Sequence, residues 1–264
     1  MRDSSVIGKT CVITGGANGI GRCLVESFAA RGARVAFIDK DKDSGRKLAE
    51  RLGDNALFMP GDIAEEATLV SFAQRVIRHF GSIHCLINNA CLSRRGLLSG
   101  CGFEDFSYVL RVGVAAPYML AKLFRDSFAQ GASIINIAST RAFMSQADTE
   151  SYSAAKGGIS ALTHALAASL SGRVRVNAVS PGWIDAGQFQ AIPSAPKHSE
   201  EDKRQHPAGR VGKAEDIAAI ALFLASDDAG FISGQNFIVD GGMTSQMVYH
   251  ADRGWSFQPD CERA

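Results

Sequence analysis

The stretch KTCVITGGANGIG, residues 9–21, joins a short apolar run to a turn that contains four glycines. The run at residues 9–14 predicts a buried strand, because it is apolar, of strand length and stopped by two glycines. The residues that follow the turn place Leu24, Phe28 and Ala29 on one helical face. A strand, a glycine turn and a helix in succession bring backbone N–H groups to a helix N-terminus, and such a site suits a diphosphate.

The alternation of strand-like and helix-like segments continues along the chain. We expect further strands at residues 34–39, 56–63, 83–91, 132–139, 173–180 and 234–242. We expect helices at residues 42–52, 65–80, 103–128 (interrupted only at Pro117) and 152–170, and a last helix that ends at Leu224. This alternation predicts a single Rossmann-type, doubly wound domain over residues 1–264, with a parallel sheet and helices on both faces.

Composition narrows the class of partner. The 28 basic and 27 acidic residues nearly cancel, which gives no support to nucleic acid or an anionic membrane as the main partner. No apolar segment approaches the roughly 18 to 20 residues of a membrane span, and residues 1–5 lack the apolar core of a signal peptide. The six cysteines show no CxxC spacing, so reduced thiols are favoured over disulfides or a metal site. We therefore expect a cytoplasmic protein that acts on a small molecule.

A second stretch, residues 139–156, carries candidate chemistry. Tyr152 and Lys156 are four residues apart in an Ala- and Ser-rich run, so a helix places them on one face. A fixed cation near a phenol lowers its pKa from about 10 and prepares it for proton exchange. Ser139 follows an apolar strand and can donate a hydrogen bond to the same substrate oxygen. A lone Tyr-x-x-x-Lys occurs often by chance, but the serine 13 residues earlier and the glycine turn make chance the poorer explanation.

These motifs resemble the short-chain dehydrogenase/reductase family from about Val6 to Gly242. The resemblance implies about seven strands, Ser139, Tyr152 and Lys156 as catalytic residues, and hydride transfer between a nicotinamide cofactor and a secondary alcohol or ketone. It also gives Lys156 a contact with the nicotinamide ribose. The 152–170 helix would take part in a four-helix interface, so we expect a homo-oligomer, either a dimer or a homotetramer.

The expected cofactor is NAD rather than NADP. Asp39 lies 20 residues beyond Gly19, where a carboxylate accepts hydrogen bonds from the adenosine ribose and repels a 2′-phosphate. Asn18 is neutral, which agrees, whereas Lys40 could soften the discrimination; a solvated strand end is the alternative reading of Asp39. The full set of expected cofactor contacts is Gly15, Asn18, Gly19, Ile20, Gly21, Asp39, Asp62, Ile63, Asn89, Tyr152, Lys156, Pro181, Gly182 and Ile184. In the family, Asp62 and Ile63 face the adenine, and Asn89 lies near a ribose. Pro181, Gly182 and Ile184 lie beside the nicotinamide.

The sequence departs from the family pattern at three positions. Cys91 replaces a glycine, either as a pocket residue or, as we favour, as a buried and inert thiol. Gly113 stands where an asparagine completes the catalytic set and holds a relay water. Ala186 stands in place of a threonine that binds the cofactor. These changes keep open a nucleotide-binding protein with little turnover.

The substrate region is expected to be polar. Arg141, Gln146 and Glu150, together with Trp183, could bind a sugar, polyol or hydroxy acid, although Arg141 and Glu150 could equally pair with each other as scaffolding. Residues 186–212 are expected to form a mobile substrate loop, and the extension 243–264, with Tyr249, Trp255 and Phe257, to pack on another surface. The alternative activity is an NADP-dependent 3-oxoacyl-carrier-protein reductase.

Overall fold

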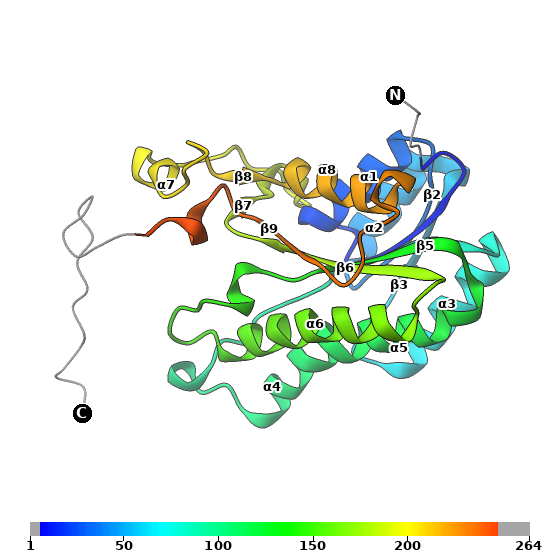
Figure 1. The fold of residues 1–264 in the computed structure, drawn as a ribbon, viewed down its shortest axis with the longest axis horizontal. Coiled ribbons are helices and arrows are strands. Elements are labelled where there is room, and N and C mark those ends of the chain that lie inside the picture. The colour runs from blue at the N-terminus through cyan, green and yellow to red at the C-terminus, as the bar shows by residue number, and fades with distance from the viewer. Residues whose placement is uncertain (1–5, 248–264) are drawn as a thin grey trace.

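A parallel sheet of seven strands forms the centre of the molecule, as the computed structural model shows for the described residues 6–247 (Figure 1). The strand order is β3-β2-β1-β4-β5-β6-β9. The strands are β1 (Thr10–Thr14), β2 (Arg34–Asp39), β3 (Ala56–Pro60), β4 (Ile83–Asn88), β5 (Phe128–Ile137), β6 (Val174–Pro181) and β9 (Asn236–Val239). The chain crosses from β3 to β4 past β1, so the order reverses there and creates the switch point at which open α/β sheets bind ligands. The predicted doubly wound architecture is confirmed.

Helices cover both faces of the sheet (Figure 1). One layer contains α1 (Gly19–Ala30), α2 (Lys42–Leu52) and α8 (Ala214–Ala225), and the other contains α3 (Glu66–Phe80), α4 (Phe103–Leu110), α5 (Ala116–Phe124) and α6 (Glu150–Ser169). Each layer has its own apolar core against the sheet. Phe28 of α1 and Phe72 of α3, one in each core, are fully buried. The strands between the layers are mostly apolar because both of their faces are covered.

The predicted helix over residues 103–128 is wrong in its middle and at its end. A π-helical turn over Arg111–Ala115 separates α4 from α5, and Pro117 lies in the first turn of α5, where its missing N–H costs nothing. Gly113 lies at the centre of this turn, and a Cβ atom built on it would be only 2.9 Å from the Cβ atom of Ala155 in α6. The turn therefore marks a close approach of two helices.

The segment after β6 contains more regular structure than expected. Two short strands, β7 (Ile184–Asp185) and β8 (Gly212–Lys213), pair in parallel, and α7 (Glu200–Arg204) begins at a capping box formed by Ser199 and Asp202. Tyr249, Trp255 and Phe257 of the extension lie outside the described residues. None of the helices between residues 6 and 247 combines the length and the apolar character needed to cross a membrane.

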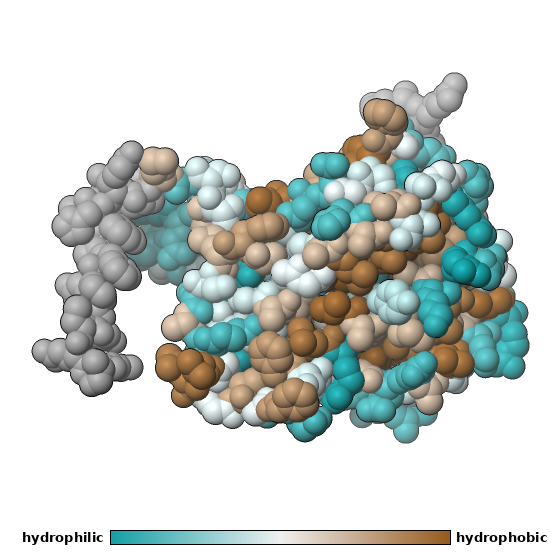
Figure 2. All heavy atoms as spheres, turned by 60° about the horizontal axis from the view of Figure 1, so that its bottom comes forward, coloured by the Kyte–Doolittle hydropathy of each residue, from teal (hydrophilic) through white to brown (hydrophobic). Residues whose placement is uncertain are grey.

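The face that carries α4, α5 and α6 exposes many apolar side chains (Figure 2). Tyr118 of α5 is 49% exposed and Phe103 of α4 is 83% exposed. Leu97 and Leu98, just before α4, are also exposed. Apolar side chains gathered on one face typically mark a contact with another molecule.

Candidate active site

Ser139 and Tyr152 meet at the carboxyl end of the sheet. Ser139 follows β5 and is 7% exposed, and Tyr152 lies in the first turn of α6. The Ser139 side chain lies close enough to the Tyr152 phenol to lower its pKa. The structure therefore brings the two predicted catalytic hydroxyls to one point, where a substrate oxygen could contact both.

Lys156 lies beside them, but its ammonium group donates its hydrogen bond to a backbone carbonyl. Its ammonium group is buried and donates to the carbonyl of Ile137 over 2.7 Å, while it lies 5.3 Å from the centre of the Tyr152 ring. Burial raises the pKa of Tyr152 above its usual value, and the Cys91 thiol raises it further. Ser139 and Arg141 act in the opposite direction but do not overcome these effects. The prediction of an acidic phenol is therefore wrong for the described residues.

Cys91 is an exposed pocket residue, and our preference for a buried, inert thiol is wrong. The residue follows the carboxyl end of β4, and its thiol raises the pKa of the Tyr152 phenol. The strand ends at Asn88, so the thiol lies beyond the covered part of the sheet. A residue at this position therefore influences the proposed acid/base directly.

A buried chain of amides fixes α6 to the sheet beneath the site. The side-chain nitrogen of Asn88 donates to Asn136 over 2.8 Å, and that of Asn136 donates to Thr163 of α6 over 2.9 Å. All three side chains are buried. Because buried polar groups must be paired, these contacts specify one position of α6 relative to β4 and β5.

The glycine turn between β1 and α1 has the shape of a diphosphate cradle. Gly15 and Gly19 have φ values of 66° and 58°, which favour glycine, and a Cβ atom on Gly21 would lie 1.8 Å from the Gly15 carbonyl oxygen. Asn18 precedes α1 without capping it through its side chain, and the first turn carries no acidic residue. The open N–H groups and the absence of negative charge in this turn fit a dinucleotide diphosphate.

Asn89 holds this turn rather than pointing freely outward. Its carboxamide nitrogen donates to the carbonyls of Thr14 and Gly15 over 3.0 and 3.1 Å, and its backbone N–H donates to the Thr14 hydroxyl. Ile20 packs against the core from the next turn. A ribose contact of Asn89 stays a prediction, whereas its role in shaping the cradle follows from these bonds.

Two carboxylates lie at the end of β2, next to the turn. Asp39 accepts hydrogen bonds from the backbone N–H groups of Ala17 and Asp41, each over 2.9 Å. The side chain of Asp41 accepts from Asn18 over 2.8 Å. Hydrogen bonds from Ser44 and Asn18 lower the pKa of Asp41, so it is charged at neutral pH. The predicted ribose corner therefore holds more negative charge than Asp39 alone supplies.

Lys40 is directed away from this corner. Its ammonium group lies 2.9 Å from Asp62 and donates to the Tyr108 hydroxyl over 2.8 Å. Tyr108 in turn donates to Asp62, and Ile63 is buried in the adjoining core. Although burial opposes it, hydrogen bonds from Ala64, Lys40 and Tyr108 lower the pKa of Asp62. An adenine contact of Asp62 and Ile63 stays a prediction.

Pro181 and Gly182 end β6 at the expected nicotinamide edge. A Cβ atom on Gly182 would lie 2.6 Å from that of Asp240, so only glycine fits there. Ile184 forms part of β7 and pairs with Gly212. The methyl group of Ala186 faces the glycine turn, where a Cβ atom on Gly19 would lie 3.9 Å away. The segment after β6 therefore covers the cradle.

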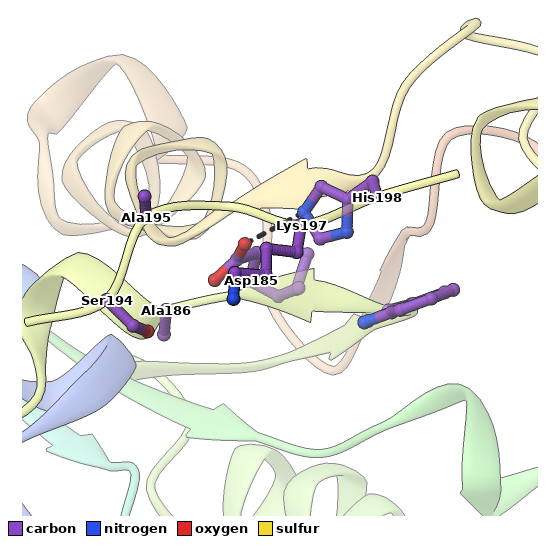
Figure 3. A pocket seen from close by; sticks show the side chains of 8 residues that line it. Asp185, Ala186, Ser194, Ala195, Lys197 and His198 are labelled. Atoms are coloured by element: carbon purple, nitrogen blue, oxygen red, sulfur yellow. Dashed lines mark ion pairs between the residues drawn. The ribbon is translucent and has the colours of Figure 1, made fainter. Parts of the chain in front are cut away.

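A cavity of about 580 Å³ opens beside this edge (Figure 3). Across it, His198 pairs with Asp185 over 2.8 Å, and Trp183 packs edge-on against His198. The cavity is lined by Trp183, Ile184, Asp185, Ala186, Ser194, Ala195, Lys197 and His198. Ser139, Tyr152 and Lys156 are not among these residues. The His198–Asp185 pair shows that part of the 186–212 loop is fastened to β7 among the described residues.

The polar loop before α6 divides into two groups. Arg141 donates to the Gln146 side chain over 2.5 Å and through its backbone N–H to Ser139, so it belongs to the site. Glu150 instead accepts from the Leu97 backbone N–H over 3.2 Å. Glu150 therefore has a scaffolding role, and the expectation that it binds substrate is not supported. Arg141 and Glu150 do not pair with each other among the described residues.

Sequence reasoning missed Asp41, Tyr108 and the His198–Asp185 pair. Asp41 follows Asp39 by two residues, and that spacing could have indicated a second carboxylate at the strand end. Tyr108 and His198 gave no such signal, because their partners lie 46 and 13 residues away in the chain.

Comparisons with known proteins identify the family of the chain. A family model described as enoyl-(acyl carrier protein) reductase matches residues 15–244. An uncharacterized oxidoreductase from Thermotoga maritima is 41% identical over 251 residues, which cover 92% of this chain and 98% of that protein. L-fucose dehydrogenase from Mus musculus is 35% identical over 242 residues, which cover 89% of this chain and 88% of that protein.

Solved structures share the whole fold. An apo SCOR enzyme from Clostridium thermocellum superposes with a TM-score of 0.86 at 41% identity, covering 96% of this chain and 99% of that chain. A 3-ketoacyl-(acyl-carrier-protein) reductase from Brucella melitensis, complexed with NADH, superposes with a TM-score of 0.81 at 30% identity. This second match covers 91% of this chain and 100% of that chain.

Proposed function

The chain belongs to the short-chain dehydrogenase/reductase family, whose members act on CH–OH groups, and on that premise we propose that it transfers hydride between NAD and a secondary alcohol or ketone. The observation that carries the proposal is the proximity of the Ser139 and Tyr152 side chains at the carboxyl end of the sheet, which also carries the glycine cradle. A paired donor and acid/base at one point is what reaction at a carbonyl oxygen requires.

The chain's own residues handle the proton. Tyr152 takes a proton from the alcohol during oxidation and returns it during reduction, and Ser139 orients the same oxygen by a hydrogen bond. Lys156, whose ammonium group lies 5.3 Å from the centre of the Tyr152 ring, is expected to contact the nicotinamide ribose when the dinucleotide is bound. The dinucleotide, when bound, supplies the nicotinamide ring that accepts or donates the hydride.

NAD is the cofactor that the ribose corner supports. Asp39 and Asp41 would both repel a 2′-phosphate, and Lys40 does not offset them because it pairs with Asp62. Charges that are fixed by several hydrogen bonds cannot move aside at low cost. An NADP-dependent 3-oxoacyl-carrier-protein reductase, the second candidate, is disfavoured by these carboxylates, although the similar Brucella protein is a 3-ketoacyl-(acyl-carrier-protein) reductase, in that case complexed with NADH.

The substrate is a small polar molecule rather than a nucleic acid or a membrane component. Arg141 and Gln146 place polar groups at the site, and Trp183, which is 41% exposed, adds an aromatic wall beside it. Sugars, polyols and hydroxy acids all match such a lining, and the similarity to L-fucose dehydrogenase is consistent with this range.

The assembly is proposed to be a dimer or tetramer that works in the cytoplasm. The exposed apolar face over α4, α5 and α6 would be covered by a second copy (Figure 2). The five described cysteines are free thiols, as in a reducing compartment. Light scattering of the full chain gives the mass of the assembly, and a monomer would contradict this part.

The experiment that tests the function is a panel of alcohols and ketones, followed through the absorbance of the reduced nicotinamide. Tyr152→Phe should remove turnover and leave NAD binding nearly unchanged. Thermal stabilisation by NAD and by NADP compares the two cofactors without turnover. A Tyr152→Phe variant with ordinary activity would exclude the assigned acid/base.

A further inference from the structure

Arg141 is built into the reaction centre. It lies in the 3₁₀ turn Thr140–Ala142, immediately after Ser139, and its backbone N–H donates to the Ser139 hydroxyl over 3.1 Å. The turn packs against α6, which carries Tyr152. The guanidinium charge reaches the Tyr152 phenol, whose pKa it lowers. Arg141 therefore acts on the same small region as the substrate oxygen.

The guanidinium group of Arg141 is only partly satisfied. One terminal nitrogen, Nη2, donates to the Oε1 atom of Gln146 over 2.5 Å. The other, Nη1, is shielded from solvent and has no hydrogen-bond partner within residues 6–247. No carboxylate in that part of the chain forms an ion pair with Arg141. A shielded cationic donor without a partner is costly, so it indicates a missing anion.

The acids on the same loop are already committed elsewhere. Asp148 accepts from the backbone N–H groups of Gly96 and Ser99, and also from the Ser99 hydroxyl. Glu150 accepts from the Leu97 backbone N–H. Both carboxylates therefore fasten the loop before α4 and leave the positive charge of Arg141 uncompensated within the described site.

We propose that Arg141 binds a carboxylate carried by the substrate, so that the enzyme acts on hydroxy acids and the corresponding oxo acids. The proposal rests on the proposed function and narrows its range of polar substrates. A carboxylate would accept a hydrogen bond from the free Nη1 atom and would also neutralise the positive charge of Arg141. A neutral sugar could accept the hydrogen bond but could not neutralise the charge. Gln146 is a positioning residue, because its carbonyl oxygen holds the guanidinium group in place.

The kinetic test compares matched substrates that differ only in charge. The probes are 2-hydroxypropanoate and 3-hydroxybutanoate, each paired with its neutral amide, and the readout is kcat/KM with saturating NAD. The wild type should prefer at least one acid over its amide by about 10- to 100-fold, the range that hydrogen bonds to charged groups supply. Arg141→Gln should remove most of this preference through KM, and Arg141→Lys, which keeps the charge, should retain part of it.

Arg94→Gln is the matched control for loss of a nearby positive charge. Arg94 is exposed and already lies 3.7 Å from Asp105, so its loss should leave the acid preference unchanged. Equal use of acids and amides by the wild type would overturn the proposal. An acid preference that survives in Arg141→Gln would overturn it as well.

A binding measurement separates this proposal from the proposed function. Calorimetry of the full chain, loaded with NADH, with butanoate and butanamide requires no turnover. Butanoate should bind to the wild type and to Tyr152→Phe, and at least about 10-fold more weakly to Arg141→Gln. If no alcohol or ketone is turned over but this pattern holds, the function fails and the carboxylate site stands. If turnover depends on Tyr152 but butanoate binds no better than butanamide, the function stands and the site fails.

Discussion

Replacing Gly113 by alanine should destabilise the protein and slow its reaction. The new Cβ atom would lie 2.9 Å from the Cβ atom of Ala155, whereas carbon atoms in good contact are about 3.5 to 4.0 Å apart. Either the π-helical turn or α6 must move by several tenths of an ångström. Since Ala155 lies between Tyr152 and Lys156 in sequence, a shift of α6 moves the reaction centre.

Two opposing effects decide the size of the change in stability. Alanine in place of glycine favours a helix by about 1 kcal/mol. Overpacking a buried contact costs about 1 to 3 kcal/mol. The difference is a loss of about 0 to 2 kcal/mol in the free energy of unfolding, and a shift of α6 by even 1 Å can reduce turnover by about 100-fold. We therefore expect a modest loss of stability with a larger loss of kcat/KM.

The assay is a double-mutant cycle with Ala155→Gly, which removes the opposing methyl group. Urea unfolding gives the free energies, and NAD-linked turnover gives the rates. Gly113→Ala combined with Ala155→Gly should be more stable than the sum of the single changes by about 0.5 to 3 kcal/mol, the range for residues in contact. The combined variant should also recover much of the lost turnover.

Additive changes in stability, or a Gly113→Ala variant with full activity, would refute the reasoning. The contact between Gly113 and Ala155 also affects any test of the asparagine that the family carries at position 113. Gly113→Asn alone meets the same methyl group, so its effect on a relay water can be judged only together with Ala155→Gly.

Four further substitutions test other parts of the structure. Cys91 raises the pKa of Tyr152 and Arg141 lowers it. Cys91→Ala should therefore move the pH profile of alcohol oxidation to lower pH, and Arg141→Gln should move it to higher pH. Shifts of both variants in the same direction would contradict this assignment. Asp39→Asn should reduce the preference for NAD over NADP, measured as the ratio of kcat/KM values, by about 10-fold or more, and an unchanged ratio would show that Asp39 does not contact the ribose. Asp240→Asn should cost about 1 to 3 kcal/mol at pH 7 by urea unfolding, because the carboxylate accepts hydrogen bonds from nearby N–H and hydroxyl groups. Although burial opposes it, these bonds lower the pKa of Asp240 below its unfolded value of 3.8, so the stabilisation is present above about pH 4 and should be lost as the pH falls through the folded pKa.

The fold could be predicted because its signals are local and repeated. The strand at residues 34–39 and the helix at residues 42–52 have the predicted bounds, since each is set by its own apolar pattern and by the turn residues at its ends. The glycine turn was found for the same reason: strand, turn and helix are adjacent in the chain. Family resemblance then supplied the number of strands.

The errors concern contacts between distant residues. The π-helical turn at Arg111–Ala115 lies where Gly113 approaches Ala155 of α6, and Cys91 is exposed beyond the end of β4; neither feature follows from the local sequence pattern. Tyr152 and Lys156 were placed correctly on one helical face. Spacing alone could not show that the ammonium group of Lys156 donates to the carbonyl of Ile137.

The groups around Tyr152 favour its protonated form. Burial and Cys91 raise its pKa, the ammonium group of Lys156 donates to the carbonyl of Ile137, and Ser139 and Arg141 lower the pKa without overcoming burial and Cys91. A substrate carboxylate bound by Arg141 would offset the charge of Arg141 and leave the phenol protonated. A protonated phenol is the form that gives its proton to a carbonyl oxygen during reduction. We therefore expect the ratio of the kcat for reduction of an oxo acid to the kcat for oxidation of a hydroxy acid to rise as the pH falls, and a ratio that does not change with pH would contradict this reasoning.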